Sequence, residues 1–206
     1  DLGNNPADRQ ALDRYIASLE GAAPSRLSRA EQFAFWANLY NAVTIDVVVE
    51  RYPVRSIRDI KPHPLAIGPW GVPRVTVEGR RLSLDTIEHE IMRPTFADPR
   101  VHYAVNCASI GCPNLQRQAF RGATLEAQLD AAARAFINHP RAVQVTPRGL
   151  RLNSIYQWFR VDFGTEAQLR THLQRYAAPG LAAQIAASPR IAGYGYDWSL
   201  NDSGPR

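Results

Sequence analysis

Apolar residues recur at helical spacing along several segments, and this pattern predicts amphipathic helices. The first segment opens at Asn5-Pro6, a cap followed by proline at the first helical position, and it ends at Gly21. The second opens at Ser28, with Glu31 placed to complete a capping box, and it stops at Tyr52-Pro53. The long apolar stripe of this second segment predicts a helix that crosses the core. Further helices are predicted over residues 84–93, 125–137 after a Thr124 cap, 165–176 after a second capping box, and 181–185.

Alternation of apolar and polar positions predicts short strands. Two hairpins are expected, one pairing residues 75–77 with 80–82 and the other pairing 143–145 with 150–152. A strand is also expected over 101–106, and it leads into a turn of small residues. The aromatic tail 194–198 is expected to pack back on the body. The predicted fold class is α+β: one domain over residues 1–206, with several helices around a small, mainly antiparallel sheet with short hairpins.

Composition narrows the function classes. Of the 206 residues, 45% are hydrophobic and 21% charged, as in soluble globular proteins. The net charge of +5 comes from arginines scattered among acids, which argues against nucleic-acid binding. No apolar run approaches the roughly 20 residues of a membrane span, so no integral membrane segment is expected. The chain starts at Asp1 and its single methionine is Met92, which a removed signal peptide or a trimmed sequence would both explain.

Both cysteines of the chain, Cys107 and Cys112, lie in the small-residue turn after the predicted strand. A thiol at such a position can face a cleft and act as a nucleophile, and we expect this of Cys107. The competing interpretation is a structural Cys107–Cys112 disulfide that closes a short loop. The two interpretations carry equal weight at this point.

A cysteine nucleophile needs a base and a third group that orients the base. His89 is the expected base and Glu88 the expected orienting group, although a lone helical histidine more often has a structural role. His102 is a weaker candidate, because alternation along a straight strand would point it to the face opposite Cys107. A turn that begins at Asn106 would bring His102 back into reach. Asn106, or the backbone amides after Cys107, would stabilise an oxyanion.

Asn38 and Asn41 are three positions apart in the second helix and share one face. Asparagine is unfavourable in a core helix unless its amide is hydrogen-bonded. Holding a nearby loop is the favoured explanation, and substrate contact is the alternative. The histidine and cysteine spacings match no common zinc motif, and nucleotide-binding signatures are missing, so neither a metal nor another cofactor is expected.

Several phrases together resemble the family catalogued as domain of unknown function 547. They run from FWANLYNA at 35–42, through Ile87-Glu88-His89 with Arg93, 98–102, Asn106-Cys107 and Cys112-Pro113, to 162–164 and 196–201. Ala37 departs from the isoleucine more common in the first phrase. The resemblance covers about residues 31–201, and it implies bacterial, exported or envelope proteins. Cys107, Glu88, His89, Asn38 and Asn41 all fall within the family's phrases.

Taken together, the sequence predicts a cysteine-dependent hydrolase or acyl-transferase that acts on an unidentified small molecule or peptide. Cys107 is the expected nucleophile, His89 the base and Glu88 its orienting group, with Asn38 or Asn41 placing the substrate. The alternative is a non-enzymatic binding module of the cell envelope, with a structural disulfide. The expected location is the periplasm or cell envelope.

Overall fold

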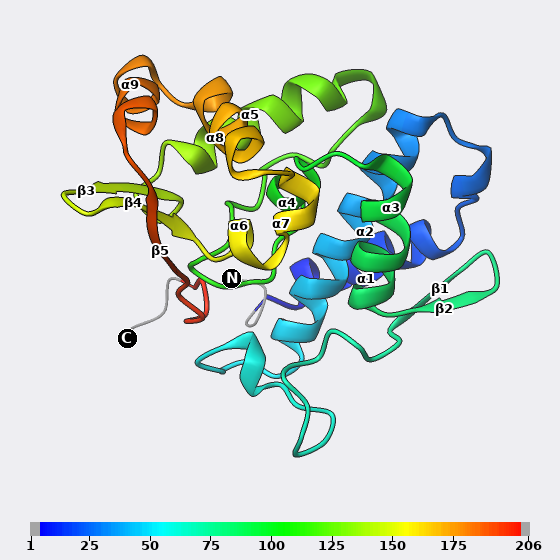
Figure 1. The fold of residues 1–206 in the computed structure, drawn as a ribbon. Coiled ribbons are helices and arrows are strands. Elements are labelled where there is room, and N and C mark those ends of the chain that lie inside the picture. The colour runs from blue at the N-terminus through cyan, green and yellow to red at the C-terminus, as the bar shows by residue number, and fades with distance from the viewer. Residues whose placement is uncertain (1–4, 203–206) are drawn as a thin grey trace.

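The computed structural model describes residues 5–202, and its fold is α+β as expected (Figure 1). The helices are α1 (Pro6–Glu20), α2 (Arg29–Val49), α3 (Arg93–Phe96), α4 (Val101–Ala104), α5 (Leu125–Ile137), α6 (Ile155–Trp158), α7 (Arg160–Phe163), α8 (Glu166–Tyr176) and α9 (Pro179–Ala187). Short 3-10 turns cover Pro24–Arg26, Ile57–Asp59 and Gly122–Thr124, and Thr86–Met92 is π-helical.

Two small sheets accompany these helices. Strands β1 (Val75–Val77) and β2 (Arg80–Leu82) form an antiparallel hairpin. Strands β3 (Val143–Thr146) and β4 (Gly149–Asn153) form the second predicted hairpin, and β5 (Ile191–Gly195) adds to β4 in parallel. The parallel pairing of β5 brings the C-terminal tail back onto the body, as predicted. Figure 1 shows the two sheets on opposite sides of the molecule, with α2 and α4 between them.

Helix α2 is the central element of the larger core. Its start follows the predicted capping box: the Glu31 backbone N–H donates to the Ser28 hydroxyl, and the Ser28 N–H donates to the Glu31 carboxylate. Apolar and small residues from 33 to 47 are buried on all sides of the helix, including Ala37 with no exposed surface. The core around α2 takes in β1, β2, α3 and part of α4, and a second core forms where α5, α8 and α9 pack on β3 and β4.

The prediction of a strand over residues 101–106 is wrong. Val101–Ala104 forms one helical turn, α4, and the chain then extends through Val105 and Asn106. All four residues of α4 are buried, His102 included, so their alternating polarity does not mark a half-buried sheet. A four-residue turn buried on every side carries no period that distinguishes helix from strand. His102 and Cys107 therefore do not lie on opposite faces of a strand.

The predicted helix at 84–93 exists, but most of it is wound as a π-helix over Thr86–Met92 before α3 continues it. Glu88 and His89 both lie in this segment. A π-helical turn is rare and concentrates at functional sites, because it shifts side chains away from the positions of a regular helix. The winding was not predictable from the apolar spacing of Leu84, Ile87 and Ile91.

Candidate active site

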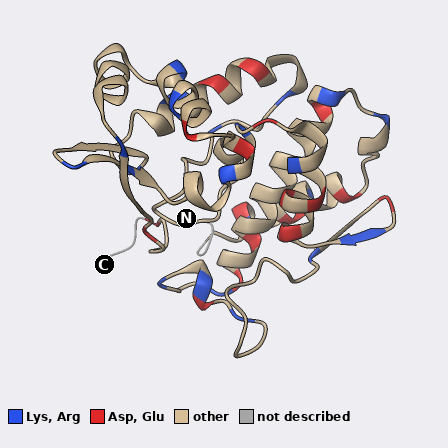
Figure 2. Cartoon of the chain, in the orientation of Figure 1, with Lys and Arg blue, Asp and Glu red and all other residues tan. Residues whose placement is uncertain are grey.

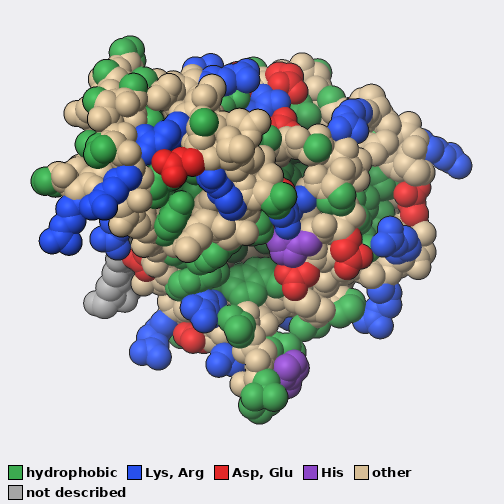
Figure 3. Space-filling model, in the orientation of Figure 1, with side chains coloured by type: hydrophobic (Ala, Val, Ile, Leu, Met, Phe, Trp, Pro, Cys, Tyr) green, Lys and Arg blue, Asp and Glu red, His purple; other side chains and the backbone are tan. Residues whose placement is uncertain are grey.

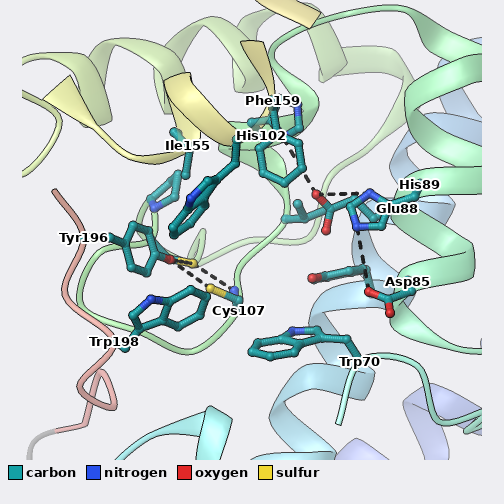
Figure 4. Close-up of a pocket in the computed structure, with 15 residues that line it drawn as sticks. Trp70, Asp85, Glu88, His89, His102, Cys107, Ile155, Phe159, Tyr196 and Trp198 are labelled. Carbon is teal, nitrogen blue, oxygen red and sulfur yellow. Dashed lines mark hydrogen bonds and ion pairs between the residues drawn. The ribbon is translucent and has the colours of Figure 1, made fainter. Parts of the chain in front are cut away.

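A pocket of about 220 Å³ lies where the two cores meet. Tyr40 and Val105 come to it from the α2 core, and Ile155 comes from the other core. Figure 3 shows a hollow floored by apolar side chains, with histidine and acidic side chains beside it. The pocket brings together four predicted catalytic residues from three segments of the chain: Glu88, His89, His102 and Cys107 (Figure 4).

The loop that carries the thiols is fixed by asparagine amides. The Asn41 side chain donates to the Ala104 carbonyl and accepts from the Asn106 N–H, each at 2.8 Å. The side-chain oxygen of Asn106 in turn accepts from the Ala108 N–H at 2.6 Å, and the side-chain NH₂ of Asn106 donates to the Pro113 backbone carbonyl. These bonds occupy the Asn106 amide and the Ala108 N–H, two of the three groups expected to stabilise an oxyanion; the third is the Ser109 N–H.

None of the three predicted substrate-binding asparagines lines the pocket. Asn38 exchanges two hydrogen bonds with the backbone of Phe120, at 2.9 and 2.8 Å, and so holds a second loop. This geometry agrees with the favoured interpretation of Asn38 and Asn41 as loop-holding residues. Asn106 is also a loop-holding residue, because its side chain bonds the backbone of Ala108 and Pro113. Asn41 and Asn106 contribute to the site by fixing the cysteine loop, whereas Asn38 holds the loop at Phe120.

The backbone at the cysteine loop has two unusual features. Ala108 adopts a left-handed conformation with φ of 58°, which is strained for a residue with a side chain. Gly111 lies so close to Tyr196 that a Cβ atom there would be 2.8 Å from the ring. The tail is tied to the loop by backbone bonds from Gly111 N–H to Asp197 O and from Ile110 N–H to Ser199 O, each at 2.8 Å. Only glycine at 111 lets the tail approach closely enough for Tyr196 to reach the thiols.

The two cysteines are free thiols that share one set of hydrogen-bond partners. The Tyr196 hydroxyl lies 3.0 Å from the Cys107 sulfur and 3.1 Å from the Cys112 sulfur. The Cys107 backbone N–H donates to the Cys112 sulfur at 3.0 Å. The Ser109 hydroxyl lies 3.2 Å from the Cys107 sulfur and is itself bonded to the Tyr196 hydroxyl. The disulfide expected by the alternative interpretation is not formed in this structure.

This arrangement divides the roles of the two thiols. The hydrogen bond to Cys112, together with burial, raises the pKa of Cys107 well above its ordinary value. Burial opposes ionisation of Cys112 too, but hydrogen bonds from the Cys107 thiol, Tyr196, the Cys107 backbone and Ser109 lower its pKa to about 7. Cys112 is 4% exposed, whereas Cys107 is partly exposed to the pocket. Both cysteines line the pocket; Cys107 is the more exposed residue, and Cys112 carries the more acidic thiol.

Glu88 lies on the other wall of the pocket. Its side chain is 10% exposed, and burial raises the pKa of its carboxyl, opposed by His89, by the hydrogen bond from Tyr40 and by Arg93. The Glu88 carboxylate oxygen is 4.0 Å from His89 Nδ1 and 3.8 Å from His102 Nδ1. A buried carboxyl with a raised pKa, placed beside two imidazoles, is a candidate for proton transfer.

The two histidines differ in what holds them. His89 is the more exposed, with Arg93 at 3.3 Å from its Nδ1 and Asp85 at 3.8 Å from its Nε2. His102 is buried, its Nε2 bonds Asp162 at 2.7 Å, and its ring stacks on Phe159 at 4.1 Å. Burial lowers the pKa of His102 in spite of the Asp162 contact. Within residues 5–202, no hydrogen bond joins the Cys107 sulfur to either histidine.

Several residues of the site were missed by sequence reasoning. Tyr196 was expected only to pack back with the tail, and Cys112 only to form a disulfide. Asp162 fixes His102 and accepts two hydrogen bonds from Arg93, at 2.6 and 3.1 Å, so it links the two histidines. Arg93 and Asp162 belong to sequence motifs of the family resemblance, and those motifs could have indicated that the two residues are part of the site. The part of the chain that the structure describes contains no group of His, Cys, Asp and Glu suited to a metal ion.

None of the helices within residues 5–202 combines the length and the apolar character of a membrane span. Comparison with curated proteins gives no match, and no solved structure matches the chain. A family model matches residues 24–137, which include Glu88, His89, His102 and both cysteines but neither Asp162 nor Tyr196. Because this match covers more than half of the chain, the protein belongs to the family described as protein of unknown function, DUF547.

Proposed function

We propose that this protein is a cysteine-dependent hydrolase or acyl-transferase that forms a thioester on Cys107. The observation that carries the proposal is the convergence of Cys107 with the Glu88–His89 pair on one pocket of about 220 Å³. A nucleophile and a proton-transfer pair on facing walls, with room for a substrate between them, meet the requirements of covalent acyl transfer. The pocket volume favours a small acyl compound or the end of a chain over an extended polymer.

The Cys107 thiol has an immediate proton acceptor in Cys112. The Cys112 sulfur receives the Cys107 backbone N–H and lies within hydrogen-bond distance of the Tyr196 hydroxyl, so a negative charge on it is stabilised. In the proposed first step the proton of Cys107 passes to the Cys112 thiolate, and the Cys107 sulfur attacks the acyl carbon. The bond to the leaving group then breaks as the thioester forms.

The leaving group needs a proton, and the Glu88–His89 pair supplies it. Glu88 has a raised pKa because it is buried, so a fraction of it keeps its proton where an exposed carboxyl would not. In the second step the ionised pair accepts a proton from water, or from an alcohol or amine that receives the acyl group, and the deprotonated oxygen or nitrogen attacks the thioester. Cys107 leaves as a thiolate and recovers its proton from Cys112, so both thiols return to their starting states. Asp162 and His102 help to position this pair: His102 Nδ1 lies 3.8 Å from the Glu88 carboxylate, and His102 Nε2 bonds Asp162.

The test is acylation of Cys107 and its dependence on the leaving group. The wild-type chain, Cys107→Ala, and Glu88→Gln are incubated with an acetyl ester of p-nitrophenol and with a matched acetyl amide of an alkyl amine. Mass spectrometry of the digested protein shows whether the Cys107 peptide carries the acyl group. We expect Glu88→Gln to slow the amide by roughly 10²–10⁴ and to slow the ester much less, because p-nitrophenolate leaves without protonation.

Two outcomes would overturn the proposal. Acyl transfer that persists in Cys107→Ala would show that the nucleophile is another residue. Absence of acylation with both the ester and the amide would instead favour a non-enzymatic binding pocket. Glu90→Gln is the matched control, because Glu90 is an exposed neighbour of Glu88 that does not line the pocket. The periplasmic or envelope location stays a prediction, and it is checked by fractionating cells that express the complete natural protein.

A further inference from the structure

The pocket is unusual in its charge and in its aromatic content. Of the 15 residues that line it, none is Lys or Arg, although the chain has 24 basic residues. Figure 2 shows Lys and Arg on many separate helices, strands and loops of residues 5–202. The lining instead includes two carboxyl groups, Asp85 and Glu88, and six aromatic side chains: Tyr40, Trp70, Trp158, Phe159, Tyr196 and Trp198.

Asp85 is the carboxylate that is free to meet a ligand. Its side chain is half-exposed, His89 Nε2 lies 3.8 Å from its carboxylate, beyond hydrogen-bond distance, and the Glu88 carboxyl is close enough for the two acids to repel each other. Figure 4 shows Asp85 beside His89 and above Trp70, on the side of the pocket away from Tyr196. Burial raises the pKa of Asp85, so an added positive charge near this carboxylate would stabilise its ionised form.

The aromatic wall completes an environment for a cation. Trp198 packs against Trp70 at 5.8 Å and stacks on Trp158 at 5.5 Å, so three indole rings form one continuous surface. The face of an indole carries negative potential and attracts alkylammonium groups, which lose little solvation when they lie against it. The Arg58 guanidinium, which does not line the pocket, lies 5.1 Å from the centre of the Trp198 ring, so this indole already accommodates one cation.

We propose that the pocket selects a small acyl compound carrying an alkylammonium group, with the charged nitrogen between Asp85 and the indole surface of Trp70, Trp158 and Trp198. This inference rests on the proposed acyl-transfer function and adds its substrate class. The nearest guanidinium behind the histidines, Arg93, is paired with Asp162 through two hydrogen bonds, so it does not cancel the charge of Asp85. The pocket is also smaller than the roughly 300 Å³ at which drug-sized sites begin, so the compound is small.

The experiment uses two probes of the same shape, of which one is positively charged and the other is neutral. Choline and 3,3-dimethylbutan-1-ol differ only in whether nitrogen or carbon lies at the centre of the branched group. Each is titrated into the full chain, and binding is followed by tryptophan fluorescence and by the slowing of Cys107 alkylation with iodoacetamide. We expect choline to bind about tenfold more tightly than its neutral counterpart, and to protect Cys107 at proportionally lower concentration.

Asp85→Asn is the variant, and Glu90→Gln is its control with the same change of charge outside the pocket. Asp85→Asn is expected to remove most of the preference for choline, whereas Glu90→Gln keeps it. The preference of the wild type is also expected to fall as salt is raised, a readout that needs no variant. Equal binding of the two probes at low salt, or equal effects of the two variants, would overturn the inference. Acylation of Cys107 remains a separate measurement, so failure here leaves the acyl-transfer proposal standing.

Discussion

The backbone N–H of Cys107 donates to the sulfur of Cys112 at 3.0 Å, so the proposed nucleophile stabilises a negative charge on its neighbour. Hydrogen bonding from the Tyr196 hydroxyl adds to this effect. The pair therefore titrates as a unit, in which the first proton lost belongs mainly to Cys112 and the second is held tightly. The reactivity of Cys107 depends on Cys112, although the two are five positions apart in sequence.

The first prediction concerns the acidity of this pair. The thiolate absorbance of the native protein is expected to rise with an apparent pKa of about 7, set by Cys112. In Cys112→Ser the remaining Cys107 thiol loses the hydrogen bond and the charge of Cys112 that raise its pKa, but it stays buried and receives no backbone N–H. Its pKa is therefore expected to lie above the value of about 7 that Cys112 gives the wild type. A Cys112→Ser protein that still titrates as the wild type does would show that Cys107 is itself the acidic thiol.

Glu88 is predicted to lower the stability of the protein at neutral pH. Burial raises its folded-state pKa above the unfolded value of about 4.3, so its contribution is fully present below that value and is lost as pH rises through the folded-state pKa. Glu88→Gln should therefore increase the free energy of unfolding at pH 7, while the difference from wild type shrinks as pH falls toward 4. Urea unfolding at a series of pH values measures this. A variant that is less stable at every pH would contradict the raised pKa.

The sequence predicted the long helices well, because their boundaries depend on local chemistry. The capping boxes at Ser28 and Thr165 and the proline after Asn5 each act within one turn of helix, and each is present in the structure. The segment 101–106 was mispredicted because α4 is a single turn buried on all sides. In such a segment the choice between helix and strand is made by distant contacts, such as the Asn41 amide on the Ala104 carbonyl.

The candidate site was predictable in part for the same reason. Residue types and family phrases indicated Glu88, His89, His102 and Cys107, and all four line one pocket. The partner of the thiol was not predictable, because Tyr196 lies 89 positions along the chain from Cys107 and reaches it through tail pairing and the space left by Gly111. Sequence spacing carries no information on a contact of that kind.

A third prediction compares two helix starts that look alike in sequence. Ser28→Ala removes a hydroxyl that accepts from the Glu31 N–H, and it is expected to cost about 1 kcal/mol of unfolding free energy. Thr124 was also predicted to cap a helix, but its side chain makes no capping bond to the backbone of α5 and donates to the Gln128 side chain instead. Thr124→Ala should therefore cost clearly less than Ser28→Ala. Thermal or urea unfolding of both variants checks the order, and equal losses would count against the capping box.

The last prediction decides which groups control the thiol. The sequence pairs Cys107 with His89 as its base, whereas the structure surrounds the Cys107 sulfur with Tyr196, Ser109 and Cys112. A neighbour shifts a pKa strongly only through a hydrogen bond or a charge within about 4–6 Å. The pH dependence of Cys107 alkylation is therefore expected to change in Tyr196→Phe, which removes the shared hydroxyl, and to stay close to wild type in His89→Ala.

His102→Ala completes the comparison. Because it leaves Asp162 and Glu88 without their shared imidazole, it is expected to lower stability, so its alkylation profile is read only at temperatures where the variant is folded. Under those conditions the profile of Cys107 should again match the wild type. A shift in His89→Ala with none in Tyr196→Phe would restore His89 as the direct base. In that case the proton would move from Cys107 to the imidazole across the pocket, and Cys112 would have no part in activating the nucleophile.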